Sequence, residues 1–251
     1  MTKKYCKNLA LAAAAVVSVS AALFIFNRVE GFKRKRAKRP PNSSSKLLNR
    51  TPVDKRVSQF ATQTLGTKKT PIYIVDNFLS PAACEKLIKS GNGKLVDSPL
   101  TYASADASFR TSQTCYFDQK SGIQPIVEKK IFSLLGLPAN AAEPSQLQHY
   151  RTGNQFKSHN DAFEGEADHE FWINGQRTWT CMIYLNEPQK GGTTFFENLN
   201  ENVVPRTGTA VIWCSLNKDG SVDENTVHQG SPVEQGEKWI TTTWFRDSPQ
   251  F

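Results

Sequence analysis

Short runs of β-prone residues, separated by turn signals, fill the second half of the chain and limit the folds it can adopt. These runs are LQHY (147–150), TWTCMIYL (178–185), TTFFE (193–197), TAVIWC (209–214) and WITTTWF (239–245). Segments such as NEPQKGG, PRTG and EQGE lie between them. β-Branched and aromatic runs of this length are typical of strands, and the intervening segments are typical of turns. This half of the chain therefore predicts a sheet-rich fold made of many short strands.

Two helices are expected before these strands. PIYIVDNF (71–78) indicates a strand, after which Ser80 can cap a helix that ends at Gly91. A second helix is expected over residues 123–135, with Gly136 as its stop signal. Helices followed by many short strands predict a mainly β domain of the α+β class. In such a domain the helices flank a double-sheet barrel or jelly roll.

Positive charge is concentrated at the N-terminal end of the chain. The net charge is +8, but residues 1–66 contain 14 Lys and Arg against two acidic residues, and the remainder contains 17 basic against 21 acidic residues. The part expected to fold is therefore mildly acidic. This balance argues against nucleic acid as a partner of the folded part.

An apolar segment without a charge occupies residues 9–26, after the basic residues 1–8. Its 18 positions approach the roughly 20 that a membrane-spanning helix needs. Two interpretations remain open: an uncleaved signal anchor, or a signal peptide that is cut near Ser20. The apolar run continues beyond that point, which favours a transmembrane anchor and hence the membrane as a partner. Residues 27–69 are expected to form a basic flexible stalk before a folded domain at 70–251.

The two flanks of the apolar segment give opposite predictions for its orientation. KRKRAKR (33–39) carries more positive charge than the N-terminus, and the positive-inside rule would then leave the following domain in the cytoplasm. The short basic N-terminus favours the opposite orientation. KRKRAKR also fits a processing site, a nuclear signal, an anionic-lipid contact or merely a solvated linker.

The five cysteines define neither a metal site nor a redox compartment. Their spacings match no CxxC pattern. Cys181 and Cys214 lie in apolar, strand-like runs, where a buried free thiol is expected ahead of a disulfide.

Four residues of the strand-rich half suggest a metal centre: His159, Asp161, His228 and Lys238. On an extended segment, His159 and Asp161 point to the same face. Two histidines and one carboxylate are the ligand set of the facial triad, which holds non-haem Fe(II) and leaves coordination positions open. A lysine supplies a compact positive charge that can meet a carboxylate. Because a His-x-Asp pair alone is common, its surroundings decide its meaning.

Five consecutive segments around these residues resemble the prolyl 4-hydroxylases in order and spacing. They are YRTGNQFKSHND (150–161), RTWTCMIYLN (177–186), GGTTFFE (191–197), PRTGTAVIW (205–213) and HQGSPVEQGEKWI (228–240). The resemblance covers about residues 70–247. It implies a double-stranded β-helix, or jelly roll, that holds Fe(II) and uses 2-oxoglutarate as co-substrate. It also implies ascorbate as the reductant that keeps the iron reduced.

The resemblance further implies roles for individual residues. The iron ligands of the family correspond to His159, Asp161 and His228. The residues that bind 2-oxoglutarate correspond to Lys238, Tyr150 and Thr194. Among these, the lysine pairs with the distal carboxylate, and the two hydroxyl groups offer hydrogen bonds.

Five other residues match positions that line the substrate groove of relatives: Arg110, Ser112, Glu143, Arg177 and Trp244. An arginine can grip peptide carbonyls, and an aromatic face can pack on a proline ring. Without the resemblance, a surface salt bridge is the more ordinary role for Arg110 and Glu143.

Three departures from the family pattern leave the ligands intact. Ser231 stands where relatives often have cysteine, Phe156 where they often have tyrosine, and Thr193 where the turn often has an acid. We therefore expect activity. Residues 101–109, near the expected groove, are peculiar to this chain.

The resemblance implies an enzyme that converts peptidyl proline, O2 and 2-oxoglutarate into hydroxyproline, succinate and CO2, and the apolar segment 9–26 predicts that it is membrane-anchored. A proline-rich peptide or protein is the expected substrate. Because the family mostly acts on secreted chains, we expect a single-pass protein of the endoplasmic reticulum or Golgi membrane with a lumenal catalytic domain. Two alternatives stay open: a same-fold oxygenase with another substrate, such as an oxygen-sensing or lysyl-directed hydroxylase, and an inactive jelly-roll binding module. The sequence predicts nothing about oligomeric state.

Overall fold

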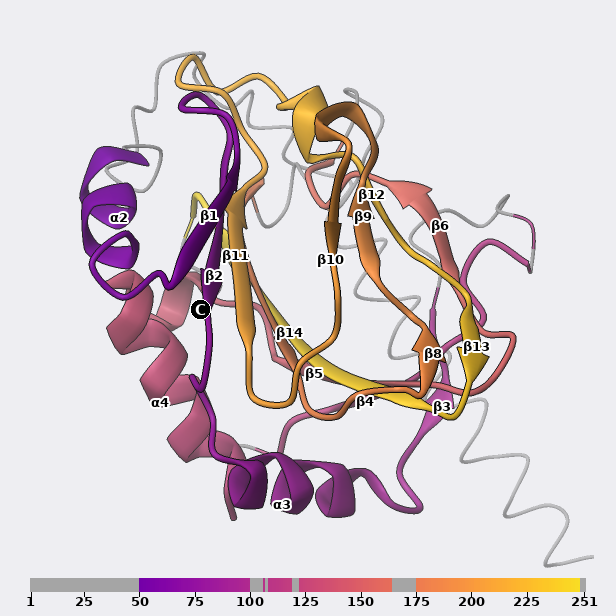
Figure 1. Ribbon diagram of the computed structural model, residues 1–251. Helices are drawn as coiled ribbons and strands as arrows, with labels where there is room; N and C mark the ends of the chain where they lie inside the picture. The colour runs from indigo at the N-terminus through magenta and orange to yellow at the C-terminus, as the bar shows by residue number, and fades with distance from the viewer. Residues whose placement is uncertain (1–49, 100–105, 107, 119–121, 164–174, 249–251) are drawn as a thin grey trace, which may run out of the picture. The chain divides into compact units, whose positions relative to one another are not determined.

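The computed structural model describes residues 50–99, 106, 108–118, 122–163 and 175–248, in which two antiparallel sheets dominate (Figure 1). The larger, sheet A, has the order β1 (Gln63–Gly66), β2 (Pro71–Val75), β11 (Ala210–Cys214), β7 (Arg177–Tyr184), β14 (Lys238–Arg246), β5 (Gln146–Tyr150), β4 (Gln113–Tyr116) and β3 (Val96–Asp97). The smaller, sheet B, has the order β10 (Glu201–Val203), β9 (Thr194–Phe196), β12 (His228–Gly230) and β6 (Phe156–His159). A separate pair joins β13 (Val233–Gln235) to β8 (Lys190–Gly191).

Three α-helices lie on the side of sheet A that faces away from sheet B (Figure 1). They are α2 (Arg50–Val57), α3 (Pro81–Gly91) and α4 (Gln124–Leu135). Short 3-10 turns follow at η2 (Ala139–Ala141), η3 (Glu197–Leu199) and η4 (Glu224–Thr226). The expected class, mainly β with flanking helices around a double-sheet core, is confirmed.

The central strands of sheet A are buried on both faces, which gives the fold two apolar cores. Along β7, Cys181 and Ile183 pack outward with the helices, and Met182 and Tyr184 pack inward with residues of sheet B. Alternate residues of a strand point to opposite faces, so one strand serves both cores. The inner core also contains Trp213 and lies between the two sheets, where the candidate site is found.

The two helices that the sequence predicts form as expected. Ser80 is the N-cap of α3, and its side chain accepts a hydrogen bond from the backbone N–H of Ala83. Helix α4 ends at Gly136, whose φ of 69° lies in the left-handed region that glycine enters without strain. The buried side of α4, which includes Val127 and Ile131, packs in the outer core.

The folded unit begins before Thr70, so the expected stalk boundary at residue 69 is wrong. Residues 50–57 form α2, whose side chains Val53 and Val57 are buried in the outer core. Strand β1 then pairs along its whole length with β2. A polar, basic stretch is thus ordered because two valines four residues apart reach the core and a strand edge is available for pairing.

The expected membrane anchor at residues 9–26 lies outside the described residues. Among the helices that the structure describes, none is both long enough and apolar enough to cross a membrane. Cys84, Cys115, Cys181 and Cys214 are buried free thiols, as expected for the last two.

Candidate active site

The two histidines of the expected triad lie opposite each other on neighbouring strands of sheet B. His159 ends β6 and His228 begins β12, and the two form a register pair with ring centroids 4.3 Å apart. Asp161 follows β6 by two residues, and its Oδ1 lies 3.9 Å from Nε2 of His159. One ligand atom from each of the three residues lies within 4.8 Å of the others. Pairing of two strands therefore brings together residues that are 69 positions apart in the sequence.

Backbone carbonyls fix the tautomer of both histidines. Nδ1 of His159 lies 2.7 Å from the carbonyl oxygen of Lys157, and Nδ1 of His228 lies 2.9 Å from that of Thr226. A carbonyl oxygen only accepts, so each Nδ1 carries the proton. In the neutral ring the lone pair is then on Nε2, which is the form that binds a metal.

The charge state of the triad also suits a cation. Burial, aided by repulsion from His228, lowers the pKa of His159 to about 3, so this ring is neutral at pH 7. Burial would raise the pKa of Asp161, but the two histidines and a hydrogen bond from Thr180 outweigh it, and the pKa is lowered. The site thus offers a neutral imidazole at His159 and an ionised carboxylate at Asp161.

Thr180 is a positioning residue that the sequence analysis missed. Its hydroxyl donates a 2.6 Å hydrogen bond to Oδ2 of Asp161. This contact occupies one carboxylate oxygen and leaves Oδ1 on the side of His159. Aromatic side chains complete the support, because Phe156 stacks on His159 at 3.6 Å and Trp213 meets His228 edge-on at 4.9 Å.

Lys238 is buried beside the triad without an acidic partner. Its side chain is 1% exposed, and burial lowers its pKa to about 7. Its Nζ lies 4.4 Å from the centre of the Tyr150 ring, and the described residues give it no carboxylate within ion-pair distance. A buried ammonium without a counter-charge is costly, so the site gains when a ligand carboxylate reaches it.

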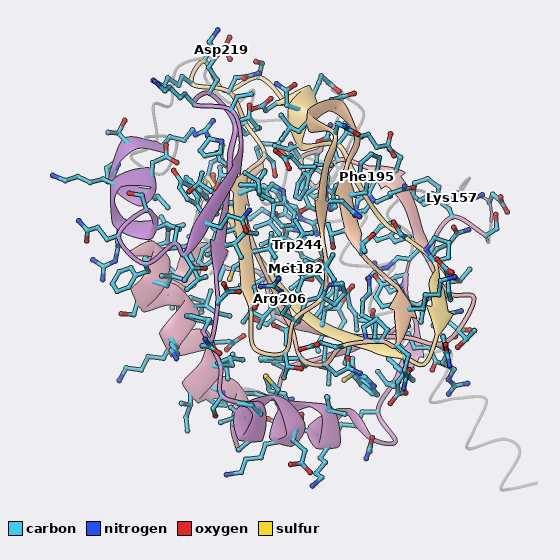
Figure 2. The ribbon with its side chains drawn as sticks, in the orientation of Figure 1. Lys157, Met182, Phe195, Arg206, Asp219 and Trp244 are labelled. Carbon is cyan, nitrogen blue, oxygen red and sulfur yellow. The ribbon has the colours of Figure 1, made fainter. Side chains whose placement is uncertain are left out.

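Alternate residues of two strands line the cavity that contains the triad and the lysine. From β14 these are Lys238, Ile240, Thr242 and Trp244. From β5 they are Gln148 and Tyr150. Figure 2 shows Met182, another lining residue, near Trp244 in the interior between the sheets. Gln148 and Thr242 were missed, although their spacing from Tyr150 and Lys238 places them on the same faces.

Both residues expected to hydrogen-bond the co-substrate lie in this cavity. The hydroxyl of Tyr150 donates to Oε1 of Gln148 at 3.0 Å. Oγ1 of Thr194 accepts a 2.7 Å hydrogen bond from the hydroxyl of Tyr184. These contacts hold both hydroxyl groups in place at the wall of the cavity.

Three of the expected groove residues form one cluster at the Trp244 end of the cavity. Glu143 makes two hydrogen bonds with Arg177, at 2.6 and 2.7 Å, and also accepts one from Arg246. The guanidinium of Arg177 lies 4.0 Å from the centre of the Trp244 ring. Burial would raise the pKa of Glu143, but the two arginines lower it. The carboxylate therefore orients Arg177, and a peptide contact of Glu143 stays a prediction.

The other two expected groove residues, Arg110 and Ser112, are not among the residues that line the cavity. Ser112 is 1% exposed, and its hydroxyl lies 2.8 Å from that of Ser98. The hydroxyl is enclosed in this structure, and a peptide contact of Ser112 stays a prediction. Nε of Arg110 donates to Oγ of Ser112 at 3.2 Å, and the Arg110 guanidinium lies 4.8 Å from the centre of the Phe156 ring. A peptide contact of Arg110 stays a prediction.

Comparison with known proteins agrees with this geometry. Residues 145–246 match the family model of the 2OG-Fe(II) oxygenase superfamily. A putative prolyl 4-hydroxylase of Acanthamoeba polyphaga mimivirus is 30% identical over 179 residues, which cover 70% of this chain and 74% of the relative. Probable prolyl 4-hydroxylase 3 of Arabidopsis thaliana is 31% identical over 196 residues, 68% of each chain. The chain belongs to the prolyl 4-hydroxylase family. It is accordingly an Fe(II)- and 2-oxoglutarate-dependent dioxygenase.

Solved structures of this family share the fold. The viral collagen prolyl hydroxylase of Paramecium bursaria Chlorella virus-1, in its 2-oxoglutarate complex, is 25% identical with a TM-score of 0.56, and the match covers 69% of this chain and 94% of that one. A prolyl hydroxylase of Trichoplax adhaerens has a TM-score of 0.54 at 15% identity, which is a likeness of fold alone.

The residues present fit both groups that prolyl 4-hydroxylases require. The two Nε2 lone pairs and the free carboxylate oxygen of Asp161 are suited to hold Fe(II) with positions left open. Lys238 supplies the charge for the distal carboxylate of 2-oxoglutarate, within the same cavity.

Proposed function

We propose that this protein hydroxylates peptidyl proline to 4-hydroxyproline, with O2 and 2-oxoglutarate as co-substrates. The observation that carries the proposal is the buried triad of His159, Asp161 and His228 beside the unpaired, buried Lys238. An inactive binding module would have no use for this combination, because an unpaired buried lysine is a cost to folding. The names of the relatives supply proline as the substrate residue.

The chain's own part is to bind, orient and exclude water. His159, Asp161 and His228 would hold Fe(II), which would supply the oxygen-activating chemistry, and ascorbate is the expected reductant. Lys238 fixes one end of 2-oxoglutarate, and the hydroxyl groups of Tyr150 and Thr194 lie at the cavity wall to hydrogen-bond it. The site lies in the inner core, so few water molecules compete with the co-substrate there.

The Trp244 end of the cavity is the proposed peptide side. Trp244 reaches the cavity from β14, and Arg177 packs against its ring. Glu143 holds the guanidinium of Arg177, so the positive charge stays in place against the Trp244 ring. A proline ring can pack on the indole, and the arginine can bind a neighbouring peptide carbonyl.

A peptide assay tests the proposal. Purified protein is incubated with Fe(II), 2-oxoglutarate, ascorbate and a proline-rich peptide, and mass spectrometry follows the gain of one oxygen atom on proline. We expect succinate to form in step with the modified peptide. The controls are a His228→Ala variant and a peptide with alanine in place of proline. Oxygen added to lysine, or succinate formed without any peptide product, would overturn the assignment to proline.

We also propose that residues 9–26 anchor the enzyme in the endoplasmic reticulum or Golgi membrane, with the catalytic domain in the lumen and proline-rich secretory chains as substrates. The support is the uncharged length of this segment and the basic residues before it. The basic run at 33–39 is the observation against this orientation.

A further inference from the structure

A second hollow lies beside α2, on the outer side of sheet A. Its volume is about 320 Å³, and its walls come from α2, the β1–β2 turn, β2 and the loop after β11. Tyr73 of β2 reaches it from the outer core, whereas Ile72 and Ile74 on the same strand face the inner core. The hollow and the iron cavity therefore lie on opposite sides of this strand and share no lining residue.

Positive charge dominates the walls of this hollow. Its basic residues are Arg50, Lys55, Lys68, Lys69 and Lys218, and its one acidic residue is Asp54. That carboxylate is already engaged: Oδ1 accepts a 2.9 Å hydrogen bond from the hydroxyl of Tyr73, and Oδ2 lies 3.4 Å from Nε of Arg50. The four lysines have no acidic partner among the residues that the structure describes.

Hydrogen-bonded turns hold the backbone of three of these lysines in place. Lys68 and Lys69 lie in a turn where the backbone N–H of Thr70 donates to Oγ1 of Thr67 at 3.0 Å. The turn is tied to the next segment, since Oγ1 of Thr70 donates to Oδ2 of Asp223 at 2.7 Å. Lys218 lies in a loop closed by the 2.8 Å backbone hydrogen bond from Asn217 to Ser221.

Such a cluster is unusual for the part of the chain that carries it. Residues 67–251 are net acidic, yet they contribute three of the four lysines that line this hollow. Like charges held close together repel, and a bound anion removes that cost. Nε of Arg50, a buried donor at the same hollow, makes the 3.4 Å ion pair with Asp54 but no hydrogen bond in the described part of the chain.

We propose that this hollow binds a ligand with clustered phosphate groups. A phosphate monoester carries about −1.5 to −2 charges and three acceptor oxygens, which suits several lysines better than a single carboxylate does. A nucleic acid is disfavoured, because base stacking needs an accessible ring and Tyr73, the aromatic lining residue, is 5% exposed. The phosphates can belong to a soluble polyphosphorylated molecule or to the headgroup of a phosphorylated lipid.

Calorimetric titration of the full chain in a neutral detergent tests the site. Sodium tripolyphosphate is the first probe, and the site variant replaces Lys68, Lys69 and Lys218 by glutamine. The matched control replaces Lys86, Lys94 and Lys129, three exposed lysines outside the hollow, so both variants lose the same charge. We expect the site variant to bind at least about tenfold more weakly than wild type, and the control to bind like wild type. Equal affinity in all three proteins, an equal loss in both variants, or no binding at all would overturn the proposal.

Two further probes distinguish the sources of the phosphate. Inositol 1,4,5-trisphosphate is the free headgroup of dioctanoyl phosphatidylinositol 4,5-bisphosphate; the lipid adds two acyl chains, and its 1-phosphate is a diester with a smaller negative charge. Tighter binding of the lipid identifies a membrane source, and equal binding identifies a soluble ligand. Either result supports the site, provided that the variant lacking Lys68, Lys69 and Lys218 binds the same probe more weakly.

Discussion

At the scale of single residues, the hydrogen bond from Thr180 to Asp161 allows the orientation of a metal ligand to be tested without replacing the ligand itself. Thr180→Val keeps the side-chain shape but removes the 2.6 Å hydrogen bond to Oδ2, so the carboxylate is free to turn. Partners of this kind are worth about 10–100-fold in metal affinity or activity. We expect the Fe(II) concentration for half-maximal activity to rise by that factor while the protein stays folded.

The matched control for this prediction is Thr178→Val on the same strand. Thr178 is also buried and donates its hydroxyl to the carbonyl oxygen of Phe245, away from the triad. Both variants lose one buried hydrogen bond, so a general loss of stability would affect both. Equal Fe(II) requirements in the two variants would show that Thr180 does not position the carboxylate.

Lys238 carries the prediction for the co-substrate. Lys238→Ala should raise the KM for 2-oxoglutarate steeply, by a free energy on the order of 2–5 kcal/mol, because the distal carboxylate would then be buried without a partner. Lys238→Arg should not restore the affinity, because a planar guanidinium differs from an ammonium in size and geometry. Steady-state kinetics at saturating peptide measures both variants. An unchanged KM in Lys238→Ala would assign the carboxylate to another residue.

Burial of the same lysine predicts a pH dependence of binding. The pKa of Lys238 is lowered to about 7 by burial, well below the ordinary value of about 10.4. A carboxylate ligand binds the positive form and raises the pKa again, so binding takes up a proton above pH 7. The affinity for 2-oxoglutarate should fall roughly tenfold per pH unit from about pH 7 upward. Anaerobic calorimetry of the Fe(II) protein in buffers of different ionisation heat measures the uptake. A pH-independent affinity between pH 7 and 9 would contradict it.

At the scale of elements, local signals predicted α4 well and missed α2. Helix α4 has a regular apolar side and a glycine stop, and both features are local. Helix α2 buries two apolar side chains, Val53 and Val57, together with Arg50, and its other residues are mostly polar or charged, so its composition resembles a solvated linker. Its order depends on packing in the outer core, which local sequence does not encode.

Some features of the site could likewise be predicted from local sequence, and others could not. The alternation of Lys238, Thr242 and Trp244 along β14 could be read from the sequence once that strand was expected. That His159 and His228 meet was predicted from the family resemblance. The residues alone do not predict it, because the two histidines come together only through the pairing of β6 with β12. Thr180 could not be anticipated, since the direction of its hydroxyl depends on how β7 lies against the segment after β6.

Helix α2 gives a stability prediction. Val57 is fully buried, so Val57→Ala should lower the free energy of unfolding by about 1–3 kcal/mol through lost burial and the space left behind. Val204→Ala is the control, because Val204 is 59% exposed and should change stability little. Urea unfolding followed by tryptophan fluorescence measures both variants. Equal midpoints for the two would mean that α2 does not contribute to the fold.

At the scale of the whole molecule, charge and hydropathy divide the chain into unlike parts. The first 66 residues are strongly basic and contain the uncharged run at 9–26, whereas the remainder is net acidic and carries the iron site. An enzyme with this division can be held at a surface by one part and act on a peptide with the other. The chemistry of the site is the same on either side of a membrane, so activity cannot report the orientation.

Orientation therefore needs a measurement of its own. If residues 9–26 form a single-pass anchor with the catalytic domain in the lumen, protease added to intact microsomes should leave a domain-sized fragment that disappears when detergent opens the vesicles. The basic run at 33–39 is the segment to mutate, because by the positive-inside rule its charge would keep the following domain in the cytoplasm. Replacing its lysines and arginines by glutamine should leave the domain protected if the lumenal orientation is correct. Digestion of the wild-type domain without detergent, together with protection of the glutamine variant, would place the native domain in the cytoplasm and exclude secretory chains as its substrates.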